Sequence, residues 1–259
     1  MKDQLTICID SSIVEVSATQ LAERLSLNIL PIHEAATPFV LNYKEGCTEL
    51  IDQESNTAIH VDFLSGSLAH RKKYGGGQGQ AIAKAIGIKK YKLPLNILDV
   101  TTGLAKDAFV LACLGCSVTM VERHPIIAEL VRNALEQAEK ADEFQKIKQQ
   151  EFKLIETDAT HYLKSLINLP DVIYMDPMYP ERKKSAAVKK NMQILQKLIG
   201  HNIDKETDES NLFELALKTA KKRVVVKRPK GAASISDSPP TMTIESKITR
   251  YDVYVLNLK

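Results

Sequence analysis

From residue 95 onward, short apolar strands alternate with helices, and this alternation constrains the fold more than any other feature of the chain. Strands are expected at residues 96–100, 117–122, 152–156, 171–175, 223–227 and 250–256. Helices are expected from Pro125 and at residues 106–114, 160–166, 190–198 and 212–221. This pattern is typical of an α/β fold, in which helices cover both faces of a mostly parallel sheet. Ligands bind such sheets beyond the carboxyl ends of the strands, which is where functional residues are expected.

The first part of the chain differs from the rest in pattern and in charge. The pattern predicts a small α+β domain at residues 1–74 and the α/β domain at residues 75–259. Residues 1–70 hold three basic and ten acidic residues, a net charge of −7; since the whole chain carries +3, the remainder carries +10. The basic part indicates a polyanionic partner such as nucleic acid, with solvated surface lysines as the alternative.

Composition argues against several classes of protein. No apolar run approaches the roughly 20 residues of a membrane helix, and the N-terminus lacks the pattern of a signal peptide. Four cysteines in 259 residues do not suggest a disulfide framework, so a cytoplasmic protein without a membrane partner is expected. Cys113 and Cys116 have the spacing of a metal or redox pair, but no second pair exists and core packing is favoured; no metal is expected.

The ends of the first three strands carry a nucleotide-binding pattern. Asp99 lies near the end of the first strand, and Gly103 lies in the turn before the next helix, although the turn is not a G-x-G-x-x-G motif. Glu122 ends the second strand, where an acid accepts hydrogen bonds from ribose hydroxyls. Asp158 follows the third strand; it either binds an adenine amine, caps the next helix, or does both.

The strongest signal is the segment Asp176-Pro-Met-Tyr-Pro180 after the fourth strand. It is similar to the [D/N]-P-P-[F/Y] motif of methyltransferases that act on exocyclic amines. Such an amine is a weak nucleophile because its lone pair is delocalised into the base. The Asp176 carboxylate and the Pro177 carbonyl can accept its two N–H bonds and expose the lone pair, and Tyr179 can stack on the base. We therefore interpret Asp176, Pro177 and Tyr179 as catalytic.

Basic segments supply the candidate RNA contacts. Seven basic residues and no acids lie between Arg71 and Lys92, around a glycine-rich stretch that is either a linker or a phosphate-binding loop. Another basic run, residues 181–190, follows the catalytic motif, and a further pair ends a later strand. The candidates are Arg71, Lys72, Lys73, Arg182, Lys183, Lys184, Lys227 and Arg228.

Together these motifs resemble the bacterial small-subunit ribosomal RNA methyltransferase J family. The resemblance is carried by His70-Arg-Lys-Lys-Tyr-Gly-Gly-Gly, by residues 99–112, by Val121-Glu-Arg-His-Pro, by the Asp176 motif and by Val226-Lys-Arg-Pro. It implies a Rossmann-like sheet with a final antiparallel strand and S-adenosylmethionine (SAM) as the methyl donor. The implied reaction is methylation of the N2 amine of one guanine in 16S ribosomal RNA or the small subunit.

The resemblance also implies the cofactor contacts. Beside Asp99 and Gly103, they are Lys106, Asp107, Glu122, Arg123, Asp158, Ala159 and Asp176. Family members usually have Gly and Arg where this chain has Ala105 and Lys106, and lysine keeps the charge without the planar fork of arginine. Met178 in place of a second proline fits the family better than it fits amine methyltransferases in general.

Other functions remain open from the sequence alone. An adenine-N6 or protein-glutamine methyltransferase would present the same NH₂ group to the Asp176 motif. A non-catalytic RNA-binding ribosome-assembly factor could retain the cofactor fold. A nicotinamide oxidoreductase is disfavoured by the poor glycine pattern. The sequence predicts no oligomeric state.

Overall fold

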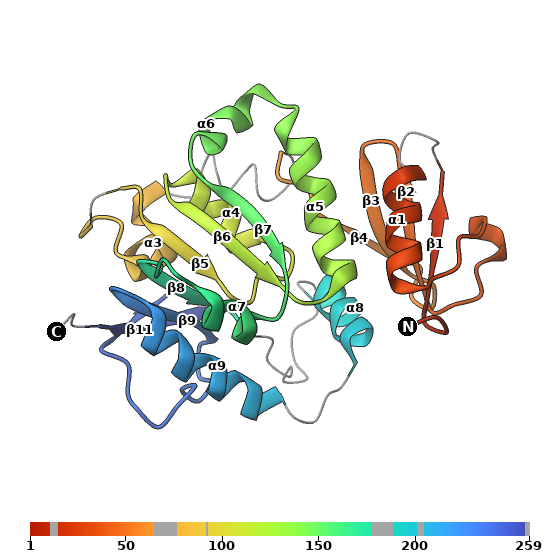
Figure 1. Ribbon diagram of the computed structural model, residues 1–259. Helices are drawn as coiled ribbons and strands as arrows, with labels where there is room; N and C mark the ends of the chain where they lie inside the picture. The colour runs from red at the N-terminus through yellow and green to blue at the C-terminus, as the bar shows by residue number, and fades with distance from the viewer. Residues whose placement is uncertain (11–14, 65–76, 92, 178–188, 201–204, 257–259) are drawn as a thin grey trace. The chain divides into compact units, whose positions relative to one another are not determined.

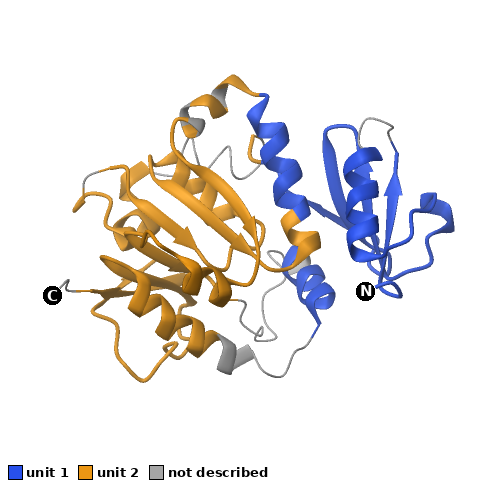
Figure 2. Cartoon of the chain, viewed as in Figure 1, with its two compact units in different colours: residues 1–62, 129–140, 181–202 blue, residues 63–128, 141–180, 203–259 orange. Residues whose placement is uncertain are grey.

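The computed structural model describes residues 1–259 except 11–14, 65–76, 92, 178–188, 201–204 and 257–259. Two compact units are present (Figure 2). Unit 1 comprises residues 1–62, 129–140 and 181–202; unit 2 comprises residues 63–128, 141–180 and 203–259. The domain boundary expected after residue 74 lies outside the described residues. Unit 2 contains the predicted alternation of strands and helices.

Unit 1 contains a four-stranded sheet in which β1 and β2 are parallel and the other pairs are antiparallel. Its strands are β1 (Leu5–Ile9), β2 (Phe39–Lys44), β3 (Cys47–Asp52) and β4 (Thr57–His60). The unit also contains α1 (Glu15–Leu25), the short helix η2 (Ile32–Glu34), α8 (Lys189–Ile199) and most of α5 (Pro125–Glu139). The Tyr43 hydroxyl on β2 donates a buried hydrogen bond to Glu129 Oε1 at 2.9 Å, so this stretch of α5 is part of the unit's core.

Unit 2 contains a seven-stranded sheet in the order β10-β11-β9-β8-β5-β6-β7. The five strands β9, β8, β5, β6 and β7 are parallel to one another. Strand β11 pairs antiparallel with β9, and β10 pairs antiparallel with β11. This confirms the expected Rossmann-like sheet with a final antiparallel strand. The strands are β5 (Asn96–Asp99), β6 (Ser117–Glu122), β7 (Phe152–Glu156), β8 (Val172–Met175), β9 (Arg223–Pro229), β10 (Met242–Glu245) and β11 (Thr249–Val255).

One face of this sheet packs against α7 (Ala159–Ser165) and α9 (Lys205–Thr219) (Figure 1). Alternate residues of the strands, such as Leu98, Ile173 and Val224, form a buried apolar cluster with Leu163 and Phe213 of these helices. Because side chains alternate along a strand, the intervening residues point to the opposite face. That alternation decides which polar residues meet at the functional site.

The opposite face contacts α3 (Ala81–Ile86) and α4 (Lys106–Cys113). The aromatic ring of Phe109 on α4 stacks on Phe63, with ring centroids 4.9 Å apart. Short helices complete the described chain: η3 (Gly77–Gly79), η4 (Asp142–Phe144) and α6 (Gln145–Lys148). Within the described residues, no helix has the length and hydropathy needed to cross a membrane.

Candidate functional site

Polar side chains gather where the parallel strands of unit 2 end. Asp99, Glu122 and Asp176 stand at or just after the ends of β5, β6 and β8, and Asp158 follows β7 by two residues. Side chains alternate between the two faces of the sheet, and Ile173, Met175 and Val226 point to the face covered by α7 and α9. Tyr174, Asp176 and Lys227 therefore lie on the other face, on the side of α4. The carboxyl ends of parallel strands are the usual position of a ligand in such a sheet.

The turn after β5 has a left-handed backbone at two positions. Gly103 has φ of 52°, and Ala105, the residue before the first turn of α4, has φ of 57°. A non-glycine residue in this region costs roughly 1 kcal/mol or more. The conformation therefore favours glycine at the position of Ala105.

Glu122 connects this turn to the start of α5. Its Oε2 accepts the Gly103 N–H at 2.9 Å, and its Oε1 accepts the His124 N–H at 2.8 Å. Burial raises the pKa of Glu122, while these backbone hydrogen bonds act against the rise. Each carboxylate oxygen has a second lone pair, so Glu122 can still accept hydrogen bonds from a ligand.

Asp99 lies beneath the turn and is 2% exposed. Its Oδ1 accepts the Thr101 N–H at 3.1 Å. Burial raises the pKa of Asp99 to about 8, and the carboxyl groups of Asp107, Asp176 and Glu122 add to the rise. A carboxyl group with this pKa is mostly protonated at neutral pH, so Asp99 can donate a hydrogen bond.

We expect Asp99 to make the stability of the protein depend on pH. A carboxyl group whose pKa is raised on folding stabilises the native state below its unfolded pKa, and that contribution is lost as pH rises toward 8. The melting temperature should therefore fall between pH 5 and pH 8, and Asp99→Asn should reduce this fall by about 3 °C or more. Thermal melts followed by circular dichroism at both pH values test this; an equal fall in both proteins would contradict it.

Lys227 joins two carboxylates at the centre of the site. Its Nζ lies 2.7 Å from Asp107 Oδ2 and 2.7 Å from Asp176 Oδ2. The Tyr174 hydroxyl also donates to Asp107 Oδ2, at 2.7 Å, and the Asp176 N–H donates to Thr101 Oγ1 at 2.6 Å. Lys227 thus holds the Asp176 carboxylate through Oδ2 and does not contact Oδ1.

The pKa values of Asp176 and Lys227 depend on each other and on Asp107. Burial lowers the pKa of Lys227, but Asp176 and Asp107 outweigh it, so the pKa rises above its ordinary value and Lys227 is cationic. Burial raises the pKa of Asp176; Lys227 opposes the rise and Asp107 reinforces it. The Asp176 side chain is nevertheless 38% exposed, so it is accessible to a ligand from solvent.

The remaining cofactor candidates follow the carboxyl ends of β5, β6 and β7. Asp158 caps α7, because its Oδ1 accepts the His161 N–H at 3.0 Å, and Ala159 behind it is buried. Lys106 at the start of α4 and Arg123 after β6 are exposed. The capping alternative for Asp158 is thus confirmed, and its exposed side chain leaves room for a ligand contact.

The basic candidates are distributed differently. Arg71, Lys72, Lys73, Arg182, Lys183 and Lys184 lie outside the described residues, as does Tyr179. Lys227 and Arg228 are described, but neither presents its charge to solvent: Lys227 is ion-paired as above, and Arg228 is 6% exposed and donates to the Ala233 carbonyl. Because side chains alternate along a strand, Lys227 and Arg228 point to opposite faces of the sheet. They therefore do not form one basic surface, as the sequence had suggested.

Two residues of the centre, Thr101 and Tyr174, were not predicted from the sequence; they hydrogen-bond to Asp176 and Asp107. Lys227 was predicted as a phosphate contact, and in the structure it is paired with Asp107 and Asp176. Alternation along β8 and β9 could have placed Tyr174 and Lys227 on the face of Asp176, but pairing between strands was needed to bring them together.

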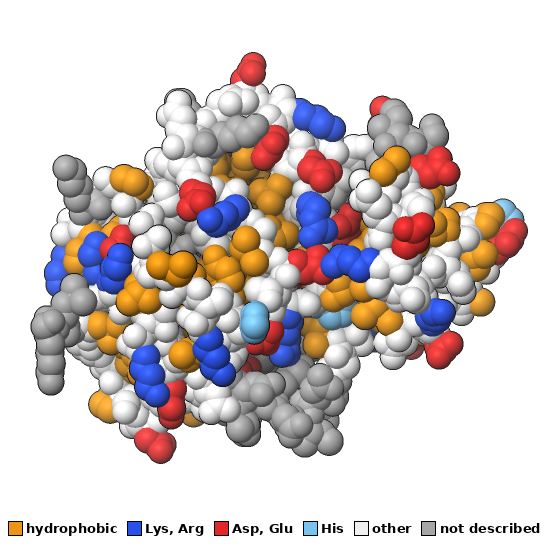
Figure 3. Space-filling view, in the orientation of Figure 1, with side chains coloured by type: hydrophobic (Ala, Val, Ile, Leu, Met, Phe, Trp, Pro, Cys, Tyr) orange, Lys and Arg blue, Asp and Glu red, His pale blue; other side chains and the backbone are white. Residues whose placement is uncertain are grey.

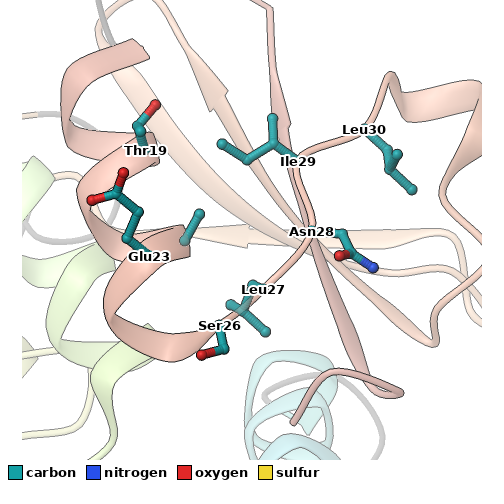
Figure 4. A pocket seen from close by; sticks show the side chains of 8 residues that line it. Thr19, Glu23, Ser26, Leu27, Asn28, Ile29 and Leu30 are labelled. Carbon is teal, nitrogen blue, oxygen red and sulfur yellow. The ribbon is translucent and has the colours of Figure 1, made fainter.

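Unit 1 has a depression of its own between α1 and the segment 26–30 (Figure 4). Apolar side chains such as Leu27 and Ile29 line it, and Glu23 is the titratable residue among its lining residues. A group of converging charged side chains is found at the strand ends of unit 2 and not among the residues lining this depression. The strand ends are therefore the candidate functional site.

Comparison with known proteins identifies the family of this chain. A family model for SAM-dependent methyltransferases matches residues 20–256. Ribosomal RNA small subunit methyltransferase J from Coxiella burnetii is 43% identical over 258 residues, covering 99% of this chain and 98% of that protein. The protein of the same name from Tolumonas auensis is 43% identical over 242 residues, 93% of each. A crystal structure of a SAM-dependent methyltransferase from Neisseria gonorrhoeae superposes with a TM-score of 0.74 at 30% identity, covering 96% of this chain and 95% of that one.

Proposed function

Since this chain belongs to the ribosomal RNA small subunit methyltransferase J family, we propose that it methylates the exocyclic N2 amine of one guanine in 16S ribosomal RNA, with SAM as the donor. The observation that supports this reaction on the chain itself is the position of Asp176 at the end of β8: Lys227 donates to its carboxylate, and its backbone N–H donates to Thr101 Oγ1. The small ribosomal subunit or its RNA in the cytoplasm is the proposed substrate.

The strand ends suit a cationic cofactor. Asp99, Asp107, Glu122 and Asp176 approach one another closely enough that carboxyl groups among them raise the pKa of Asp99 and Asp176. SAM carries a sulfonium and an ammonium group beside one carboxylate, and its two cationic groups would relieve this repulsion. When bound, SAM supplies an electrophilic methyl group. We propose that Glu122 holds the ribose hydroxyls and that Asp99, Asp107 and the turn at Gly103 hold the remainder, together with the exposed Lys106, Arg123 and Asp158 and the buried Ala159.

The acceptor amine is held by Asp176 and Pro177. Lys227 engages Oδ2 of Asp176, so Oδ1 can accept one N–H of the amine, and the Pro177 carbonyl can accept the other. These two contacts draw the nitrogen toward tetrahedral geometry and direct its lone pair to the methyl group. No strong general base is required, because the methylated nitrogen is acidic enough to lose its proton readily.

We expect Glu122→Gln to weaken the binding of SAM. Two charge-assisted hydrogen bonds to the ribose would be lost, and the new NH₂ group would face the N–H of Gly103 or His124. The dissociation constant for SAM should rise about 10- to 100-fold, as measured by isothermal titration calorimetry. Glu151→Gln, at an exposed residue before β7, is the matched control and should bind SAM normally. Equal affinity of the Glu122 variant and wild type would remove Glu122 from the proposed cofactor site.

The proposed function is tested with tritiated SAM and small ribosomal subunits that lack their native modifications. Label recovered as N2-methylguanosine in 16S RNA is the expected result. Label in N6-methyladenosine or in a protein glutamine would replace the proposed acceptor by the corresponding one. SAM binding without any label would instead favour a non-catalytic assembly factor that retains the fold.

A further inference from the structure

A second cluster of charges lies at the amino ends of the same parallel strands. Two connections meet there: residues 87–91, which follow α3 on the way to β5, and residues 220–222, which lead from α9 to β9. The Lys221 N–H donates to the Pro170 carbonyl and the Lys222 N–H to the Asp171 carbonyl, so the second connection is fixed beside β8. Basic side chains gather near this end of unit 2 (Figure 3).

Arg223, the first residue of β9, forms hydrogen bonds with α3 and with Tyr91 in the connection that follows α3. Its Nη1 donates to the Ala85 carbonyl at 2.6 Å, and its Nη2 donates to the Tyr91 hydroxyl at 3.2 Å. Gly87 has φ of +83°, and a Cβ added there would lie 2.8 Å from Arg223 Cζ. The guanidinium thus fills the space that a side chain at residue 87 would need, and the position of Tyr91 follows from this contact.

Three cationic side chains lie within cation–π distance of the Tyr91 ring. Arg223 Cζ lies 4.9 Å, Lys222 Nζ 5.1 Å and Lys90 Nζ 5.5 Å from the ring centroid. Lys89 and Lys221 are exposed beside Lys90 and Lys222 in the chain. We call this group the Tyr91 basic cluster: Lys89, Lys90, Tyr91, Lys221, Lys222 and Arg223.

The charges of the Tyr91 basic cluster are compensated only in part by the contacts within it. Asp171 forms an ion pair with Lys222, at 2.6 Å, and its other oxygen accepts the Asn96 N–H. Among the described residues, the ion pair found for these five cations is the one between Lys222 and Asp171, so a bound polyanion would relieve the repulsion between the remaining charges. Cation–π contacts of about 0.5–1 kcal/mol each at exposed sites offset part of that repulsion without neutralising any charge.

We propose that the Tyr91 basic cluster is a second RNA contact, which binds backbone phosphates of the substrate away from the methylated base. Arg223 begins β9 and Lys227 is four residues further on, so the cluster lies about 13 Å or more along the strand from the catalytic centre. Phosphate contacts at such a distance fix the register and orientation of the RNA. This inference rests on the proposed function, because the RNA is the substrate.

The test is the salt dependence of binding to unmodified, protein-free 16S RNA. The variant Lys89→Gln/Lys90→Gln/Lys221→Gln removes three exposed charges and leaves the Lys222–Asp171 pair intact. The plot of log affinity against log salt should become shallower by about 2–3, and the dissociation constant near 0.15 M salt should rise about 10-fold or more. The KM for RNA should rise in parallel while kcat stays unchanged.

The control removes three exposed lysines elsewhere: Lys140→Gln/Lys153→Gln/Lys164→Gln. An unchanged salt slope in the cluster variant, or an equal change in the control, would overturn the proposal. An effect confined to assembled subunits and absent with protein-free RNA would also overturn it, in favour of an acidic ribosomal protein as the partner. Binding is measured without SAM, so the salt slope decides this proposal even if no methyl transfer is detected and the proposed function fails.

Discussion

Asp176→Asn is expected to lower kcat for RNA methylation roughly 10²- to 10³-fold, even when SAM is saturating. Asparagine has nearly the same shape, but it is neutral, and its NH₂ group must face either Lys227 or the acceptor amine, both of which are donors. The amine then loses the charged acceptor that draws its lone pair out of the base. Single-turnover kinetics with saturating SAM and RNA measure the effect on the chemical step directly.

Asp171→Asn is the matched control for this substitution. Asp171 stands at the opposite end of β8 and is also ion-paired to a lysine, Lys222, which precedes β9. Its replacement removes an equivalent charge pair from the same strand without touching the catalytic centre, so kcat should stay unchanged. Equal kcat losses in the two variants would mean that Asp176 acts through the stability of β8 and not through the acceptor amine.

The sequence predicted the order of strands and helices in unit 2 because that order depends on local patterns. The apolar strand ending at Asp99, the glycine turn and the helix ending before Gly115 are all recognisable from neighbouring residues. The strand β10 was not predicted, because its four residues are mostly exposed and its apolar–polar alternation extends over too short a segment to identify a strand. The helix α9 begins at Lys205, seven residues before the predicted start, because its first turns carry polar residues without the apolar period.

The candidate site was predicted in part for the same reason. The positions of Asp99, Glu122, Asp158 and Asp176 follow from their place at strand ends, which the sequence reveals. The contact between Lys227 and Asp176 spans 51 residues and depends on β9 pairing with β8 in register, Met175 opposite Val226. Such a register is set by tertiary packing, so a lysine that was interpreted as a phosphate contact is found between two carboxylates instead.

Lys227→Met is expected to shift the acidic limb of the pH–rate profile to higher pH and to lower kcat at pH 7 about 10-fold or more. The acceptor role of Asp176 requires the ionised carboxylate. Burial and Asp107 raise its pKa, and Lys227 is the cation that opposes the rise, so removing Lys227 raises the pKa further. More Asp176 is then protonated at pH 7, and a higher pH is needed to restore its charge.

The other titratable groups around Asp176 cannot replace Lys227, so a shift of the acidic limb reports the effect of Lys227 on the pKa of Asp176. Asp107 on α4, Asp99 at the end of β5 and Tyr174 on β8 all lie near it, and none of them supplies a compensating positive charge. Lys227→Arg retains the cation and should keep the acidic limb close to its wild-type position, even if the larger guanidinium lowers kcat. Activity of Lys227→Met should recover in part at high pH, whereas that of Asp176→Asn should not. If the acidic limb stays in place in Lys227→Met, then Lys227 contributes to the fold of the site alone, and the ionisation of Asp176 must be maintained by another group.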